Sequence, residues 1–391
     1  MKTVKRENFD VIVVGGGTAG VAAAVSAAKR GKSVLLIEKH CMLGGLATSG
    51  LISWYEPICN GLGDKIMASL SEYFVKMAIE KGYDTLDSRW GGHREQANKR
   101  YCTFFSPNFF ALSLTEYCLE NGVKLRFDTL VTEPIMDGNR IVGLVTESVS
   151  GREEFGAKVV IDCTGTAIVS QRAGVPTEDG ENWFVYISHE CTLDNAKEAA
   201  QQGEIGKIRN WKNVGYEPGP ETRWQYPASI KKVKGTDADA ETEWLIKGHL
   251  GTLKRYENTD KETREIVSIP NMPQYRTIRR IKGAYEFVGL GDANGDSRII
   301  GRTNDVGRAG VTHLVPYGCL YHADFPNLLA AGRIISASGD GWNVTRIIPV
   351  CVLTGQTAGI AAAHSIDEGV AVGDIDYAAL RAELEQEGVT F

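Results

Sequence analysis

Residues 9–38 of the 391-residue chain read FDVIVVGGGTAGVAAAVSAAKRGKSVLLIE. The apolar run that ends at Val14 is rich in β-branched residues and predicts a strand. A glycine motif spaced G-x-G-x-x-G begins at Gly15, and the alanine-rich segment Val21–Lys29 predicts a buried helix. The apolar run Ser33–Ile37 predicts a second strand. Strand, glycine motif, helix and strand in this order predict an α/β fold that begins with a parallel sheet.

The glycine motif and the acid after the second strand predict a dinucleotide site. Gly15 permits a tight turn, Gly17 lets a pyrophosphate approach the backbone, and Gly20 lets helix and strand pack closely. Glu38 lies where a carboxylate accepts hydrogen bonds from ribose hydroxyls, and it would repel the 2′-phosphate of NADP. A glycine-rich turn in an unrelated α/β protein would not require this acid. The predicted contacts around the motif and the acid also include Thr18, Ala19 and Lys39.

A second glycine-rich stretch, Gly44-Gly45-Leu46-Ala47-Thr48-Ser49-Gly50, follows the acid closely. The arrangement resembles the FAD-binding half of the glutathione-reductase-type flavoproteins. The resemblance implies that this stretch passes along the pyrophosphate and ribityl chain of FAD, and that FAD is the cofactor. It adds Gly44, Gly45, Leu46, Ala47 and Thr48 to the predicted cofactor contacts.

Later segments extend the resemblance to the broad family of FAD-dependent oxidoreductases, which is distantly similar to fumarate reductase flavoproteins. The segment 158–165 resembles the strand that returns to the nucleotide domain, 327–333 resembles the last strand, and Pro349 begins a predicted helix that ends before Gly369. The helix would aim its positive end at the flavin. The resemblance adds these cofactor contacts: Val131, Thr164, Gly165, Gly332, Arg333, Gly355 and Gln356.

The predicted fold is an α/β Rossmann-like FAD-binding domain that is interrupted by a mixed α+β substrate or cap domain. Residues 1–174 form the first part of the FAD-binding domain, with a helical excursion at about 50–120. Residues 175–310, which are more charged and aromatic, form the cap domain. Residues 311–391 complete the FAD-binding domain.

Composition excludes several classes of partner. The 43 basic and 49 acidic side chains give a net charge of −6, which argues against a nucleic-acid-binding surface. No apolar stretch reaches the ~18 residues of a membrane span, so we expect a cytoplasmic protein without a membrane partner. The eight cysteines form no Cys-x-x-Cys pair, and no metal site is predicted.

Flavin chemistry requires a proton donor or acceptor beside the substrate. His313 and Tyr317 precede the last predicted strand and are the first candidates, although a histidine is more often a packed or surface residue. Arg279 belongs to a cluster that would bind a carboxylate or, equally, lie on a solvated helix face. Arg346 and Asp340 lie near the expected flavin, where Gly339-Asp340 stands in place of the histidine and acid usual in the family.

The predicted function is hydride transfer between flavin N5 and a small polar organic substrate. One alternative is fumarate-reductase-like reduction of an activated double bond in a carboxylate. Another is a flavin-carrying electron-transfer subunit of a larger complex, for which no cysteine cluster or basic face is visible. No motif identifies the physiological electron donor or acceptor, and the sequence leaves homo-oligomerisation open.

Overall fold

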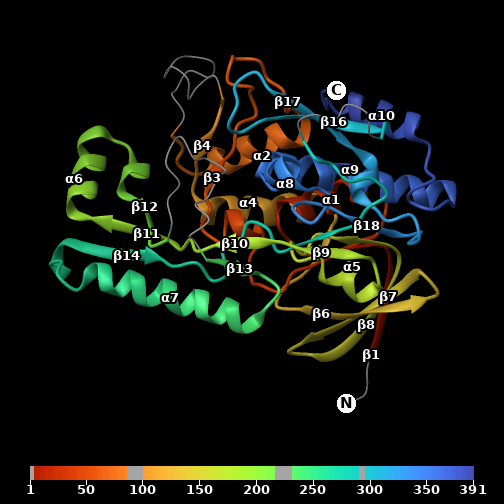
Figure 1. Ribbon diagram of the computed structural model, residues 1–391, viewed down its shortest axis with the longest axis horizontal. Helices are drawn as coiled ribbons and strands as arrows, with labels where there is room; N and C mark the ends of the chain where they lie inside the picture. Colours follow the sequence, from red (N-terminus) through yellow and green to blue (C-terminus); the bar gives the residue numbers. More distant parts are fainter. Residues whose placement is uncertain (1–3, 86–99, 216–230, 290–295) are drawn as a thin grey trace.

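A computed structural model describes residues 4–85, 100–215, 231–289 and 296–391 (Figure 1). Its largest sheet has seven strands in the described part of the chain, in the order β5-β2-β1-β8-β7-β6, with β18 pairing to β8. These strands are β1 (Val4–Val14), β2 (Val34–Ile37), β5 (Lys124–Arg126), β6 (Leu130–Asp137), β7 (Arg140–Ser148), β8 (Gly151–Asp162) and β18 (Leu328–Ala330).

The strands β5, β2, β1, β8 and β18 are parallel, and their carboxyl ends are level with one another. Val14 pairs with Ile37 on one side and with Asp162 on the other, and Ala330 also pairs with Asp162. The α/β fold with a parallel sheet is therefore confirmed. β6, β7 and the first half of β8 form an antiparallel meander.

Two helices pack together on one face of the sheet, α1 (Thr18–Ala28) and α9 (Ile348–Glu368). Glycine makes this approach possible, because a Cβ at Gly355 would lie 2.1 Å from the Ala19 carbonyl oxygen, and one at Gly359 would lie 2.2 Å from that of Ala23. The predicted helix beginning near Pro349 is confirmed, and its C-cap Gly369 is left-handed at φ 69°. The other face is covered by apolar side chains of β6–β8 and α5 (Ile168–Ala173).

The described part of residues 50–120 contains helices and short strands. They are β3 (Trp54–Tyr55), α2 (Ser69–Glu80), β4 (Thr103–Phe104) and α4 (Pro107–Glu120). The helix α2 begins only at Ser69. Before it, the Asn60 side chain accepts hydrogen bonds from the Leu62 and Asp64 amides and holds a turn.

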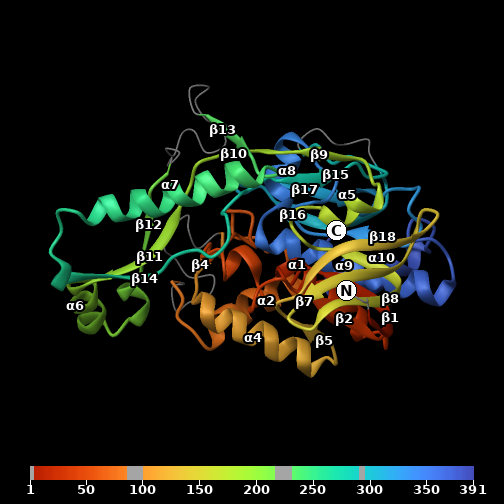
Figure 2. The same cartoon turned by 90° about the horizontal axis from the view of Figure 1, so that it is seen from below.

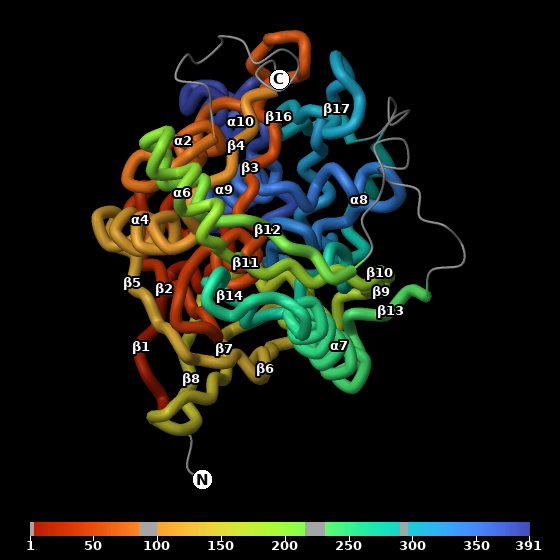
Figure 3. Tube along the Cα trace, turned by 90° about the vertical axis from the view of Figure 1, so that its left-hand side faces the viewer, coloured from red at the N-terminus to blue at the C-terminus, as the bar shows by residue number. Residues whose placement is uncertain are grey.

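Part of the middle of the chain forms a lobe to one side of the sheet (Figures 1 and 2). Its three-stranded antiparallel sheet has the order β12-β11-β14, and Figure 3 looks onto this side of the molecule. The lobe consists of β11 (Ile187–Thr192), α6 (Leu193–Gln202), η2 (Ile205–Ile208), β12 (Asn210–Asn213), α7 (Ala238–Tyr256), η4 (Lys261–Thr263) and β14 (Arg264–Ser268).

Short antiparallel pairs connect the remaining segments, and β16 pairs with β17 across the predicted domain boundary at residue 310. These elements are β9 (Thr177–Asp179) with β15 (Arg279–Ile281), β10 (Glu181–Trp183) with β13 (Lys232–Lys234), and β16 (Ile299–Asn304) with β17 (Thr312–Pro316). The last elements are η1 (Gly45–Ala47), η5 (Tyr317–Leu320), α8 (Gly339–Thr345) and α10 (Tyr377–Gln386).

No single helix among the described residues is long and apolar enough to cross a membrane. The helices α8 and α9 reach that length and composition only as a pair, which is bent by 84° at the break between them.

Candidate functional site

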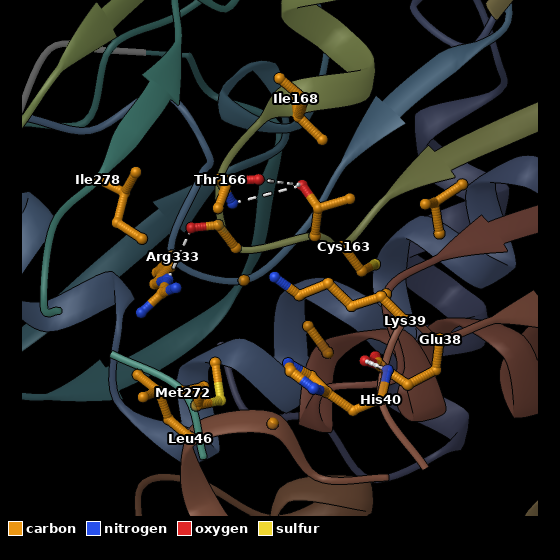
Figure 4. Close-up of a pocket in the computed structure, with 18 of the residues that line it drawn as sticks. Glu38, Lys39, His40, Leu46, Cys163, Thr166, Ile168, Met272, Ile278 and Arg333 are labelled. Carbon is orange, nitrogen blue, oxygen red and sulfur yellow. Dashed lines mark hydrogen bonds between the residues drawn. The ribbon is translucent and has the colours of Figure 1, made fainter. Parts of the chain in front are cut away.

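A cavity of about 410 Å³ opens where the parallel strands end (Figure 4). Its wall contains residues that directly follow four of those strands: Gly15 after β1, Glu38 after β2, Cys163 after β8 and Ala331 after β18. Ligands of open α/β sheets bind at the carboxyl ends of the strands, so the fold itself places the site here. The cavity continues to Arg346, Ile348 and Cys351, at the amino end of α9.

The two predicted glycine-rich loops lie side by side on this cavity. The Gly44 amide donates to the Gly16 carbonyl oxygen at 2.8 Å, and Gly15 has the positive φ of 99° that a tight turn requires. A Cβ built on Gly17 would meet no atom within 4 Å, so the glycine leaves open space. Gly17 also caps α1, whose first turn contains no acidic side chain. A bare backbone at a positive helix end fits the pyrophosphate of FAD.

Glu38 is buried at the end of β2 and is organised by backbone groups. Its carboxylate accepts hydrogen bonds from the Gly16 amide at 2.5 Å and from the His40 amide at 2.8 Å. A carboxylate fixed in this way fits the ribose hydroxyls of FAD. Burial lowers the pKa of the neighbouring His40, which therefore favours its neutral form. Lys39 points across the cavity in Figure 4.

Most predicted cofactor contacts lie on the cavity wall. They are Gly15, Gly17, Thr18, Ala19, Glu38, Lys39, Gly44, Gly45, Leu46, Ala47, Val131, Thr164, Gly165, Gly332 and Arg333.

Four predicted cofactor contacts do not line the cavity, because each has a structural partner. Thr48 donates its hydroxyl to the Leu43 carbonyl oxygen at 2.5 Å. Gly20 packs against Gly15, where a Cβ would lie only 1.8 Å from the carbonyl oxygen. Gly355 packs against α1, as described above. The Gln356 amide donates to the Ser69 hydroxyl at 2.8 Å.

Two arginines lie together at the α9 end of the cavity. Arg333 donates through Nε to the Gly165 carbonyl oxygen at 2.8 Å and through Nη1 to that of Tyr275 at 2.6 Å. Among the described residues it forms no ion pair with a carboxylate, and burial lowers its pKa only to about 10, so it remains charged at neutral pH. Both Arg333 and Arg346 act electrostatically on Cys351. This end of the cavity therefore favours negative charge.

The third predicted arginine, Arg279, also lines the cavity, but on strand β15 rather than on a helix. Its Nε donates to the Asp179 carboxylate at 3.1 Å. The prediction of a solvated helix face for this cluster is wrong, because the neighbouring Arg280 is 2% exposed and forms ion pairs with Glu178 and Glu286.

Three catalytic candidates do not line the cavity. His313 is buried with Nε2 3.2 Å from the Asp305 carboxylate, and Tyr317 is buried with its hydroxyl donating to the Val372 carbonyl oxygen at 2.6 Å. Asp340 is exposed and forms an ion pair with Arg308. His313 lies on β17 itself, whose pairing with β16 holds its side chain beside Asp305, and Tyr317 follows in η5. The position before the last strand therefore does not bring these two side chains to the cavity wall.

The cavity wall also contains residues that the sequence did not predict. The turn before α7 and its first residues contribute Gly235, Thr236, Asp237, Ala238 and Glu241, and Met272 and Ile278 contribute apolar surface. The Asp237 cap of α7 is a recognisable signal for a helix start, but nothing local connects that start with a cavity. The cysteines in the wall are protonated, because burial raises the pKa of Cys351 to about 12 and that of Cys163 well above its usual value.

The sequence matches the family described as FAD dependent oxidoreductase over residues 10–298 and again over 185–384. A digeranylgeranylglycerophospholipid reductase of Methanoculleus marisnigri is 28% identical over 197 residues, which cover 44% of this chain and 42% of that protein. An NADH:acrylate oxidoreductase of Vibrio harveyi is 44% identical over 158 residues, which cover 39% of this chain and 14% of that protein. The aligned part is less than half the length of either relative.

A geranylgeranyl bacteriochlorophyll reductase-like protein of Thermoplasma acidophilum has a solved structure that is 13% identical, with a TM-score of 0.46. That match covers 98% of this chain and 83% of the other. The family match spans well over half of this chain and agrees with the two glycine loops, Glu38 and the level strand ends. The chain belongs to the family of FAD-dependent oxidoreductases, and FAD is its cofactor.

Proposed function

We propose that this protein transfers a hydride between flavin N5 and a small polar organic substrate. The observation that carries the proposal is the continuity of one cavity from Glu38, which suits the ribose, to Arg346 and Ile348 at the amino end of α9. Bound FAD supplies a ring system that accepts or gives a hydride at N5.

The chain's own groups suit this chemistry. The amino end of α9 and the guanidinium groups of Arg333 and Arg346 stabilise negative charge at one end of the cavity. The apolar side chains of Leu46, Met272 and Ile348 help exclude water from it.

A second candidate is reduction of an activated double bond in a carboxylate substrate. The two arginines near Cys351 favour it, because a guanidinium binds a carboxylate through two parallel hydrogen bonds. The relative that is named for acrylate supports the same substrate class.

An anaerobic assay at the flavin absorbance band tests both candidates. Alcohols and amines are added to the oxidised FAD-loaded protein, and unsaturated carboxylates such as acrylate and fumarate are added to the photoreduced protein. Bleaching in the first arm supports a dehydrogenase, and recovery of the band in the second supports the reductase. If neither arm responds and only a partner protein exchanges electrons with the flavin, both candidates are wrong.

The arginine positions provide a variant for the same assay. We expect Arg346→Gln to slow the productive arm by about 100-fold, since a lost charge-assisted contact in a dry site costs about 3 kcal/mol. Arg152→Gln is the matched control, because Arg152 lies on β8 and pairs with Glu133 and Glu147 outside the cavity. Equal rates for both variants would contradict the assignment of Arg346.

A further inference from the structure

Glu56 directly follows β3 and contacts α9 across the fold. Its Oε2 accepts a hydrogen bond from the Ile348 amide at 3.1 Å, although the two residues are 292 positions apart. Ile348 is the first residue of α9, and the first turn of that helix contains no acidic side chain of its own. A carboxylate from a distant segment therefore supplies the negative charge at this helix end.

The environment of Glu56 connects it with the flavin end of the cavity. Arg346, Ile348 and Cys351 surround its carboxylate from the α8–α9 segment, and all three line the cavity. The other titratable groups that face it are Tyr55 on β3 and Cys102, which precedes β4.

The carboxyl group is poised to change charge near neutral pH. Desolvation raises the pKa of Glu56 to about 7, even though the Ile348 amide and the Arg346 guanidinium both favour the ionised form. Burial also raises the pKa values of Tyr55 and Cys351, so these neighbours stay neutral where Glu56 titrates.

We propose that Glu56 is a positioning residue that sets the electrostatic potential which the amino end of α9 and Arg346 present to the flavin. When Glu56 is ionised, its charge offsets both positive groups. When it takes up a proton from solvent, both act fully on the cavity. Hydride uptake leaves extra negative charge on the flavin, so ionised Glu56 disfavours the reduced cofactor. The inference rests on the proposed function only in placing the flavin ring at the α9 end.

The midpoint potential of the bound flavin, measured with redox dyes between about pH 5.5 and 8.5, tests this role without any substrate. Glu56→Gln keeps the size of the side chain and an oxygen that can accept from the Ile348 amide. The control is Glu116→Gln on α4, because Glu116 forms an exposed ion pair with Lys81. We expect Glu56→Gln to match the wild type at the acidic end. At the basic end its potential should be higher by ~30 mV, equivalent to a tenfold change in the reduced-to-oxidised ratio.

Curves that coincide at every pH, or that differ by the same amount at every pH, would overturn the proposal. If Glu56→Gln fails to retain FAD, the wild-type curve alone decides the question, because it must steepen around neutral pH and a constant slope contradicts the role. If the potentials of wild type and Glu56→Gln differ with pH as expected but no substrate changes the flavin band in the anaerobic assay, the proposed function is refuted and this inference stands.

Discussion

The two ends of the cavity are built differently. At the nucleotide end, Gly15, Gly17 and Glu38 lie within one short segment and act mainly through backbone geometry. At the α9 end, Glu56 meets Ile348 across 292 positions of sequence. The nucleotide end is encoded by a local segment and binds FAD. The α9 end depends on tertiary packing, and in our proposal it sets the electrostatic potential at the flavin. Changes at each end should therefore have different consequences.

The largest effects should come from two alanine substitutions in the glycine motif, which separate cofactor binding from folding. Gly17→Ala should fold normally, because the residue has φ −64° and its new Cβ meets no protein atom within 4 Å. The methyl group occupies the space left for FAD, so we expect about 100-fold weaker binding by fluorescence titration, or about 2.7 kcal/mol.

Gly20→Ala should instead destabilise the protein before any cofactor is added. Its Cβ would lie 1.8 Å from the Gly15 carbonyl oxygen, and overpacking of this kind costs about 3 kcal/mol. Thermal unfolding of the cofactor-free variants measures the difference. If both variants unfold at the same temperature, the distinct roles of the two glycines are refuted.

The nucleotide end could be predicted because each of its residues has a local signal. Glu38 was identifiable as an acid directly after a strand, and the structure places it beside the glycine motif that it serves. His313 does not line the cavity, because a position before the last strand does not determine where a side chain points. Pairing of β17 with β16 directs His313 towards Asp305. Glu56 carried no signal, because its partner belongs to the far end of the chain.

The stability of the contact between the lobe and Leu51, which follows the second glycine-rich stretch, should depend on pH. His189 on β11 is buried with Nε2 3.1 Å from the Leu51 carbonyl oxygen, and Leu51 has a positive φ of 57°. Burial, helped by Arg209, lowers the pKa of His189 to about 4. His189 therefore binds a proton more tightly in the unfolded chain than in the folded one. The stability that neutral His189 gives the folded protein is present above about pH 6.5 and is lost as the pH falls towards 4.

We expect this titration to remove about 3 kcal/mol of stability at most between those pH values. Denaturant unfolding at several pH values should show the loss in the wild type and a flatter curve in His189→Gln. His322→Gln, at a partly exposed histidine near the surface, should retain the wild-type slope. An unchanged slope in His189→Gln would show that this contact does not respond to acid through this residue.

A smaller effect is expected at His313, which sharpens the contrast between residues inside and outside the cavity. Burial alone would raise the pKa of Asp305. Hydrogen bonds from His313 and Arg308 outweigh burial and hold this pKa well below its usual range. His313→Gln should cost about 1–2 kcal/mol through the weakened bond, and FAD affinity should stay unchanged. Loss of flavin reduction at full FAD occupancy would restore His313 as a catalytic candidate.

The smallest effect is expected from Asp340→Asn. Asp340 and Arg308 are 48% and 44% exposed, and Arg308 keeps its second partner, Asp305, when the Asp340 charge is removed. An exposed ion pair contributes about 0.5 kcal/mol or less, so unfolding and the flavin potential should both match the wild type. Asp305→Asn removes the buried partner of the same arginine and should cost several times more. A change in flavin potential for Asp340→Asn would mean that an exposed ion pair also reaches the flavin, which would contradict the assignment of this electrostatic control to Glu56 and Arg346 at the α9 end.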